Sequence, residues 1–536
     1  QKKAIFQLDK DMIVSAGAGS GKTMVLVNRY LELLKQKRAW PRQIVAITYT
    51  RKAAQEMLSR LIMEIDRCRR ESESIYWSEI KEQIYHAPIN TIHGFCTMIL
   101  KEFPVEAGVD PRFAILEEIE SKLLVTKIIE EILACDNEET ADLKALYPYH
   151  LPLLLRELYD KYTERETAFV NIAPDFCRNV EAKWELFKSA VQKLLAETNG
   201  LPESSSRYVL ERLADKWPIY EKYLPHALPD DFSIEISDIM QEFKLSKNCP
   251  AKIKELIVDL ADKADDYLAA IISAKIPRLK KQVTGLLMQI RNKYKTIKER
   301  NGWLDFTDLL SLTLELLKNN VKTRQKLKER YGYFLIDEFQ DTNGLQKEII
   351  DCLMESRYGQ GRLFIVGDPK QSIYRFRGAD VSVFLQTKEE ILARGGEYVP
   401  LTDNFRSHPR LVQSFNAYFK EIFPAPYSYE DMKSHRQDYG WESRIEILYY
   451  RTEGDTAEQR RKAEAEAIAA HIKRIVRDKE TYQTVREGLT WRDIVLLFAG
   501  MTNIHVYEKA LVQAEIPYYI VNGRGFYQQQ EIIDAC

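Results

Sequence analysis

The sequence predicts an α/β protein, built on a parallel sheet, with a long helical domain inserted into it. Short apolar runs of strand length alternate with helical patterns on either side of the insertion, and this alternation is typical of parallel sheets. Residues 119–294 instead show long helical periodicity with few β-branched runs. At 536 residues the chain is long enough for three or more folding units, each with its own core.

Four short apolar runs are the strand candidates of the first sheet. They are residues 12–14, 44–47, 333–336 and 363–366. The third and fourth runs are each followed by acidic residues. Because parallel sheets bind ligands at the carboxyl ends of their strands, we expect the functional residues at these ends.

Helical patterns at 122–133 and 251–274 belong to the predicted insertion. Beyond about residue 386, further strand candidates and a helical pattern indicate a second α/β domain, apparently incomplete. These candidates are strands at 445–450, 493–498 and 517–521, with a helix at 463–476. The expected division is 1–118 and 295–385 for the two parts of the first α/β domain, 119–294 for the inserted helical domain and 386–536 for the second α/β domain.

Composition limits the kinds of partner. The formal net charge of −2 excludes a uniformly basic nucleic-acid binder, so any phosphate-binding surface must be local. Residues 275–300 carry nine Lys or Arg and one acid, although such a run is equally typical of a solvated helix face. No apolar run approaches the roughly 20 residues of a membrane span, so no membrane partner is expected.

Cysteine usage and the two ends of the chain complete this outline. The seven cysteines are scattered, with no C-x-x-C pair and no His at metal-ligand spacing. They are interpreted as reduced thiols of a cytoplasmic protein. The chain starts without Met and stops in what resembles an unfinished helix, so we expect it to be a fragment.

A Gly-rich segment, AGAGSGKT, follows the first strand candidate and precedes a helical pattern, which is the context of a P-loop. Small residues let backbone N–H groups surround phosphate oxygens, and a helix N-terminus favours the negative charge. Lys22 would reach the β and γ phosphates of ATP, and Thr23 would hold Mg²⁺. The alternative is a structural Gly-rich turn. The expected nucleotide-binding residues are Ser15, Ala16, Gly17, Ala18, Gly19, Ser20, Gly21, Lys22 and Thr23.

An Asp-Glu pair follows the third strand candidate and supplies the other half of such a site. Asp337 suits Mg²⁺, directly or through water. Glu338 suits a general base that orients and deprotonates the attacking water. Acids are common at strand ends, so the pair gains its meaning only together with the P-loop.

With FQDT directly after it, this pair forms the block DEFQDT, and together with AGAGSGKT it resembles the UvrD-like superfamily 1 helicases. Further blocks resemble the family's motifs in family order: ITYTRKAA at 47–54, TIHGFC at 91–96, VGDPKQSIYRFRGAD at 366–380 and LTDNFRS at 401–407. The resemblance implies RecA-like P-loop NTPase domains and an ATP-dependent DNA helicase that uses ATP and Mg²⁺. It also implies translocation from 3′ to 5′.

Three details resemble the AddA and RecB branch more than the UvrD, Rep and PcrA branch, and AddA fits better than RecB. They are DPRF at 110–113, WLDFTDL at 303–309, and Pro369-Lys370 with Phe376 in the fourth-strand block. In that branch the motor is fused to a C-terminal nuclease and works in double-strand-break repair. The partners implied are DNA, as single strands and duplex ends, and an AddB-like subunit.

The resemblance also implies roles for individual residues. Gln1 would read adenine and Phe405 would pack against it. Gln371 would bond the γ-phosphate, and Arg406 would act as an arginine finger, for which the alternative is a surface salt bridge. The implied catalytic residues are Lys22, Glu338, Gln371 and Arg406.

Single-stranded DNA is gripped by aromatic faces and backbone contacts, so little sequence preference is expected. Phe376 replaces the Trp of the UvrD branch, and each aromatic has core packing as its alternative. The DNA-binding residues implied are Thr48, Tyr49, Arg51, Thr91, His93, Tyr374, Phe376 and Arg377.

The family's last two motifs do not appear before Cys536, and the segment from Gly523 through Asp534 resembles the block that precedes its second inserted domain. We therefore expect this chain alone to bind ATP but to hydrolyse it poorly. Two alternatives remain open. One is a stand-alone UvrD-type or Rep-type helicase without a nuclease, and the other is an ATP- and DNA-binding subunit without motor activity.

Overall fold

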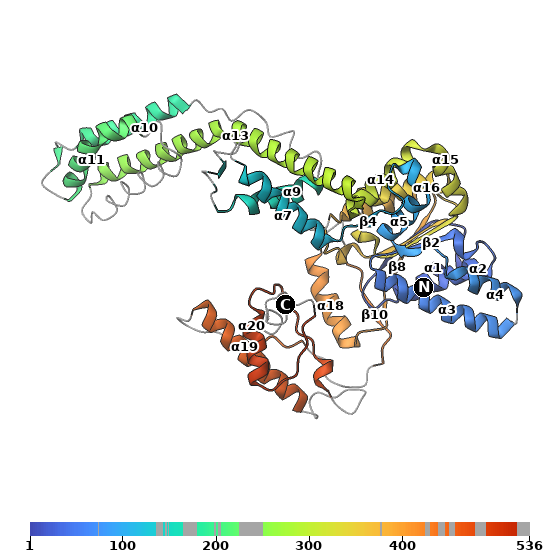
Figure 1. The fold of residues 1–536 in the computed structure, drawn as a ribbon. Helices are drawn as coiled ribbons and strands as arrows, with labels where there is room; N and C mark the ends of the chain where they lie inside the picture. Colours follow the sequence, from blue (N-terminus) through green and yellow to red (C-terminus); the bar gives the residue numbers. More distant parts are fainter. Residues whose placement is uncertain are drawn as a thin grey trace, which may run out of the picture. The chain divides into compact units, whose positions relative to one another are not determined.

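The computed structural model describes most of the chain and divides it into two compact units (Figure 1). Unit 1 is residues 1–92 with 325–536, and unit 2 is residues 93–324. The residues described are 1–72, 74–135, 143–144, 147, 149–164, 180–197, 200–201, 205–223, 250–375, 378–423, 429–437, 445–449, 456–477 and 489–521.

Unit 1 contains a six-stranded sheet in the order β3-β2-β6-β7-β1-β8. Every neighbouring pair in it is parallel. All four predicted strands are confirmed, as β1, β2, β6 and β7. The strands are β1 Met12–Ala16, β2 Ile44–Thr48, β3 Ile89–Thr91, β6 Tyr333–Ile336, β7 Leu363–Gly367 and β8 Glu397–Leu401.

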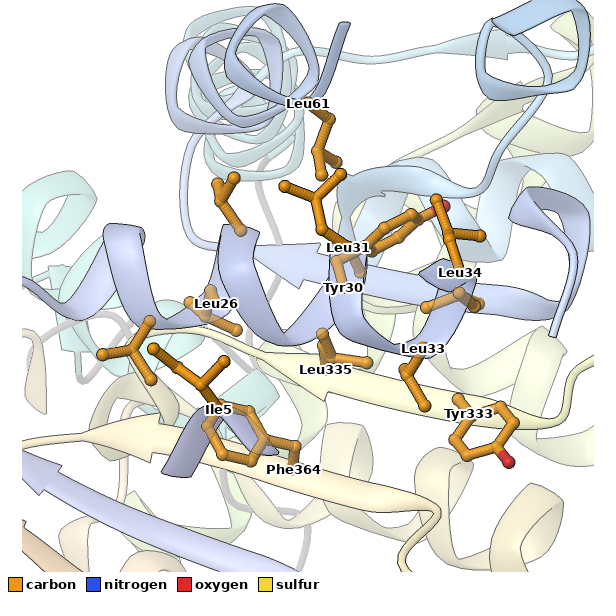
Figure 2. Packing of buried hydrophobic residues seen from close by; sticks show 14 of the residues in the cluster. Ile5, Leu26, Tyr30, Leu31, Leu33, Leu34, Leu61, Tyr333, Leu335 and Phe364 are labelled. Carbon is orange, nitrogen blue, oxygen red and sulfur yellow. The ribbon is translucent and has the colours of Figure 1, made fainter. Parts of the chain in front are cut away.

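Helices that connect these strands cover the sheet. Along β1, alternate residues Met12, Val14 and Ala16 join one apolar cluster with helix residues, as the two-residue period of a strand requires. Figure 2 shows Leu26 and Tyr30 of one helix facing strand residues that belong to the same cluster. The helices concerned are α1 Lys2–Phe6, α2 Lys22–Lys35, α3 Arg51–Ser72, α4 Ile75–Ile84, α16 Gly344–Met354 and α17 Val381–Ala393.

The first sheet extends past residue 385, where we expected the first α/β domain to end. Strand β8 pairs in parallel with β1, from Met12 opposite Glu397 to Ala16 opposite Leu401. The expected boundary is therefore too early for this sheet. β8 gave a weak signal because it carries Pro400, which only an edge strand tolerates easily.

The rest of unit 1 is mainly helical in the part described. A small core joins α19 to α20, with Trp491, Ile494 and Leu496 packed against it, and the predicted helix at 463–476 is confirmed within α19. The elements are β9 Asp403–Asn404, α18 Pro409–Ile422, β10 Lys433–Ser434, α19 Ala457–Arg477 and α20 Ile504–Gln513.

The strands expected at 445–450, 493–498 and 517–521 are wrong for the residues described there, 445–449, 493–498 and 517–521, which form no strand. The alternation that predicted them is partly present: Ile494 and Leu496 pack against the small core, while Val495 and Leu497 are exposed. A strand also needs a hydrogen-bonded neighbour. Among the described residues after β8, the ladder assigned pairs β9 with β10.

Unit 2 is organised along α13, which confirms the helical patterns predicted at 122–133 and 251–274. The first half of α13 packs with α10 and α11, and its second half with α7 and α9, around two separate apolar clusters (Figure 1). The elements are α5 Ile92–Glu102, α6 Pro104–Ala107, β4 Ala114–Ile115, α7 Glu118–Ala134, α9 Leu151–Glu164, α10 Val180–Ala196, α11 Ser205–Tyr223, α13 Ala251–Asn301, β5 Trp303–Leu304, α14 Phe306–Asn319 and α15 Val321–Arg330, whose end belongs to unit 1.

This compact unit is larger than the predicted insertion at 119–294. Strand β4 precedes the insertion, β5 follows it, and the two pair in parallel. Helices α6 and α14 also contact each other. Over the described residues, no helix is long and apolar enough to cross a membrane.

Candidate functional site

The predicted P-loop joins β1 to α2 in unit 1. Ser15 and Ala16 are the last residues of β1, and Lys22 and Thr23 are the first residues of α2. Between them Gly19 and Gly21 have φ of 79° and 86°, a left-handed conformation that glycine adopts without steric cost. The loop is further held by the Ser20 hydroxyl, which donates to the Gly17 carbonyl at 2.7 Å.

The segment after β8 lies directly against this loop. Asn404 Nδ2 donates to the carbonyl of Ala18 at 2.9 Å, and the backbone N–H of Phe405 donates to the carbonyl of Gly19 at 2.9 Å. A Cβ on Gly19 would lie 2.8 Å from the Cβ of Arg406. Phe405 and Arg406 are thus brought to the loop, as the resemblance implied for residues that contact a bound nucleotide.

Asn404 shapes this segment and was not predicted. Its Oδ1 accepts hydrogen bonds from the backbone N–H groups of Arg406 at 3.0 Å and Ser407 at 2.8 Å. The ring of Phe405 is 47% exposed and stacks on His435 with centroids 5.1 Å apart. An exposed aromatic face beside a phosphate loop is the surface that a purine needs for stacking. The sequence signal for Asn404 was its place in the block LTDNFRS.

Gln1 also meets the loop, because its Nε2 donates to the carbonyl of Ser20 at 2.8 Å. The short helix α1, which begins at the next residue, is held by the buried Arg29 of α2. Arg29 Nη1 donates to the carbonyls of Ala4 at 2.7 Å and Gln7 at 2.9 Å. Burial lowers the pKa of Arg29 to about 10, against the opposing effect of nearby Asp11, so its charge is retained at neutral pH.

Lys22 and Glu338 form the central ion pair of the site. Lys22 Nζ lies 2.8 Å from Glu338 Oε1 and 2.9 Å from Oε2. Glu338 follows β6 and has a φ of 49°, a conformation that non-glycine residues rarely adopt and that is frequent at functional sites. The P-loop and the end of β6 are therefore within direct contact.

Two further carboxylates surround this ion pair. Burial raises the pKa of Asp337 to about 6, the charge of Glu338 adds to the increase, and Lys22 opposes it. Burial and Glu338 likewise raise the pKa of Asp341 to about 6. Three neighbouring carboxylates thus share one lysine, and this excess of negative charge attracts cations.

The donor set fits Mg²⁺ held partly by a nucleotide. In the described part of the chain, no three His, Cys, Asp or Glu side chains are arranged to hold a metal ion. Mg²⁺ commonly binds through one or two carboxylates, with water and substrate phosphates completing its ligands. Asp337, with Thr23 in the first turn of α2, would supply the protein ligands.

The segment after β7 contributes Asp368, Lys370 and Gln371. Gln371 Nε2 donates to Asp368 Oδ2 at 2.8 Å, and Lys370 Nζ lies 3.0 Å from Asp368 Oδ1. In the sheet β7 lies between β6 and β1. Gln371 is therefore placed on the strand end between the P-loop and the Asp-Glu pair.

The residues implied in DNA binding are only partly brought together. The rings of Tyr49 and Tyr374 stack with centroids 4.8 Å apart at 25°. Thr48, in contrast, is buried and its hydroxyl donates to the Thr50 carbonyl. Arg51 is exposed and Thr91 partly so.

His93 belongs to unit 2, where its ring lies 5.0 Å from that of Phe306. Phe376 and Arg377 lie outside the described residues, as does the segment from Gly523 through Asp534. The DNA-binding assignment as a whole stays a prediction.

Sequence reasoning missed Gln340. Its side chain is buried between Glu338 and the backbone of Asp368. It lies inside the block DEFQDT, and this position was the only signal for it in the sequence.

A P-loop between a parallel strand and a helix, faced by an Asp-Glu pair on another strand of the same sheet, defines a P-loop nucleoside-triphosphate-binding protein. Residues 1–391 match the family model of the UvrD/REP helicase N-terminal domain, and residues 399–536 match the UvrD-like helicase C-terminal domain. The chain therefore belongs to the UvrD-like helicase family.

Its curated relatives include proteins named as the AddA component of an ATP-dependent helicase/nuclease. The one from Carboxydothermus hydrogenoformans is 29% identical, over 99% of this chain and 51% of its own length. The one from Listeria welshimeri is 27% identical, over 99% of this chain and 49% of its own. The chain thus spans about half the length of these relatives.

Proposed function

We propose that this chain is the motor of an ATP-dependent DNA helicase, which hydrolyses ATP with Mg²⁺ and thereby moves along single-stranded DNA. The observation that carries the proposal is the contact of Lys22 with Glu338 at 2.8 Å, because it joins a phosphate-binding loop to a general base. A module that only binds nucleotide has no use for such a base. Membership of the UvrD-like family supports DNA as the second ligand.

The ion pair suggests how binding prepares hydrolysis. Lys22 Nζ contacts both carboxylate oxygens of Glu338, and the phosphates of ATP would compete for the same ammonium group. Once Lys22 contacts phosphate, Glu338 is available to accept a proton from the attacking water. Mg²⁺ on Asp337 and Thr23 would neutralise charge on the phosphates.

Arg406 and Gln371 would act on the same phosphates. Arg406 is exposed beside Gly19, so its guanidinium can stabilise negative charge that develops in the transition state. Gln371 lies at the end of β7 and would bond the γ-phosphate. Because the block 366–380 also contains Tyr374, this segment links the phosphates to the predicted DNA contacts.

The finer proposal is a motor that moves from 3′ to 5′ within a helicase-nuclease of double-strand-break repair. The names of the relatives support the nuclease and a second protein in the complex, for which an AddB-like chain is proposed. The polarity follows from the family resemblance. Translocation on single strands that carry a label at either end would test the polarity, and release of the 3′ label alone would contradict it.

The first test is ATP hydrolysis with and without single-stranded DNA, on residues 1–536 and on the full natural protein. We expect strong stimulation by DNA in the full protein. Lys22→Ala should reduce hydrolysis about 100-fold or more, the scale seen when one preorganised charge-stabilising donor is removed.

Each alternative predicts a different result. Retained hydrolysis in Lys22→Ala would show that the phosphate site is misassigned. DNA binding without stimulation in either form would favour the binding module without motor activity. A full protein that unwinds DNA but cuts none would favour the stand-alone helicase.

A further inference from the structure

Gln340 lies at the junction of the two acidic strand ends of unit 1. It belongs to the short helix η4 (Phe339–Asp341), directly after the Asp-Glu pair, and only 2% of it is exposed. A buried amide must have its hydrogen bonds satisfied, so its partners are informative.

Both ends of this amide contact the catalytic segments. Nε2 donates to Glu338 Oε2 at 2.7 Å and to Asp341 Oδ2 at 3.3 Å. Oε1 accepts the backbone N–H of Asp368 at 2.9 Å. A backbone N–H can only donate, so this contact fixes the amide orientation and directs the NH₂ group toward Glu338.

The amide is also sterically fixed. A Cβ on Gly367 would lie 2.6 Å from Gln340 Oε1 and 2.9 Å from the ring of Phe384. Gly367 therefore leaves the space that the amide occupies at the end of β7. The hydroxyl of Ser372 donates to the Gln340 carbonyl at 3.2 Å, so backbone and side chain both contact the segment after β7.

We propose that Gln340 is a positioning residue that orients the carboxylate of Glu338 for hydrolysis and couples it to the segment that carries Gln371. The proposal rests on the proposed function, which makes Glu338 the general base. Lys22 contacts both oxygens of Glu338, whereas Gln340 contacts only Oε2. When Lys22 moves to phosphate, Gln340 holds Oε2, and Oε1 is left to take the proton from water.

The coupling runs through Asp368. Its backbone N–H bonds Gln340, and its Oδ2 accepts the hydrogen bond from Gln371 Nε2 at 2.8 Å. A shift of Gln371 toward a phosphate therefore acts on the residue that orients the base. The order of contacts is Gln371, Asp368, Gln340 and Glu338.

Gln340→Met in the full natural protein tests this role, because Met keeps the length of the side chain and removes the amide. We expect kcat of DNA-stimulated ATP hydrolysis to fall about 10- to 100-fold, within the range typical of general-base catalysis. KM for ATP should change by less than about 2-fold, since Gln340 makes no contact expected to bind substrate in the ground state.

The matched control is Gln386→Met on the exposed face of α17. Gln386 also donates to a glutamate, Glu390, at 2.8 Å, but far from any strand end that carries an acid. It should leave kcat and KM unchanged. An unchanged kcat in Gln340→Met would overturn the proposal.

A double-mutant cycle with Glu338→Gln separates positioning from general damage. If Gln340 acts through Glu338, adding Gln340→Met to Glu338→Gln costs no further activity in single-turnover hydrolysis. Additive losses would show a merely structural role and overturn the proposal. Wild-type kcat in Glu338→Gln itself would instead overturn the proposed function.

Thermal unfolding checks that the variants fold. If Gln340→Met does not fold, Gln340→Glu takes its place in the cycle, because it keeps the shape but cannot donate to Glu338. The expected and contradicting results are then the same.

Discussion

Two glycines in unit 1 share one backbone angle but differ in their surroundings. Gly19 and Gly395 both have a φ of 79°. A Cβ on Gly19 would lie 2.8 Å from the Cβ of Arg406 and 3.1 Å from Asn404 Oδ1, whereas nothing lies within 4 Å of the corresponding position on Gly395. The pair therefore separates backbone strain from crowding at the candidate site.

Alanine at each position tests this difference. Both substitutions should destabilise the fold by about 1 kcal/mol, the cost of a left-handed non-glycine residue. Only Gly19→Ala should weaken ATP binding, by about 10-fold or more, because it pushes Arg406 and Asn404 away from the P-loop. Titration with a fluorescent ATP analogue measures the affinity, and thermal unfolding measures the stability.

Equal affinity losses in the two variants would contradict the placement of Arg406 beside the loop. Equal stability losses with an affinity loss in Gly19→Ala alone would support it. The comparison needs no assumption about hydrolysis.

At the scale of elements, a buried charge network joins the end of α13 to the start of α14 in unit 2. Lys298 is 7% exposed, and its Nζ bonds Asp305 at 2.7 Å as well as Asp308. Asp305 caps α14 by accepting the backbone N–H of Asp308 at 2.9 Å, and the Tyr294 hydroxyl donates to it at 3.0 Å. Burial opposes ionisation of Asp305, but Lys298 and these donors lower its pKa overall.

Asp305→Ala should therefore destabilise unit 2 by about 2–3 kcal/mol, through the loss of the helix cap and of one partner of a buried lysine. The control is Glu299→Ala, on the same turn of α13, because Glu299 is exposed and lies 3.8 Å from Lys295. It should change stability by less than about 0.5 kcal/mol. Urea unfolding followed by circular dichroism measures both, and similar losses would contradict the network.

At the scale of the whole molecule, the order of the sheet decides which distant segments meet. Tyr49 follows β2 and Tyr374 follows β7, and β6 lies between these strands. Their rings nevertheless stack 4.8 Å apart. All three strands end at the same edge because the sheet is parallel, so aromatic residues and the acidic pair share one side of unit 1.

We expect Tyr374→Ala to reduce affinity for single-stranded DNA about 10-fold, since stacking on one base contributes roughly 1–3 kcal/mol. Tyr85→Ala is the control, because Tyr85 is also exposed but lies at the end of α4, away from these strand ends. Fluorescence anisotropy with a labelled oligonucleotide measures both variants. Equal affinities for the wild-type protein and Tyr374→Ala would show that this stack is not a DNA contact.

The sequence was most informative where local pattern and function coincide. The four apolar runs gave β1, β2, β6 and β7 because strands buried on both faces are continuously apolar. Lys22 and Glu338 were found because a P-loop and an acid pair need fixed residue types at fixed spacing. Their ion pair confirms that the two segments meet.

It was least informative where an interaction joins distant segments. The edge strand β8 carries a proline, and the segments around Ile447, Val495 and Tyr519 alternate without forming strands. In both cases the outcome depends on whether a neighbouring backbone is present to complete a ladder. Local pattern reports side-chain burial and carries no record of that neighbour.

The sequence by itself determined the fold class, the phosphate loop, the acid pair and the family. Only the tertiary structure decided that Asn404 fastens Arg406 to the loop and that Gln340 connects Glu338 to Asp368. The physical reason is that a phosphate site needs particular residues within a few positions of one another, which a sequence shows directly. Hydrogen bonds between segments depend instead on the order of strands in the sheet, which is set by packing of the whole unit.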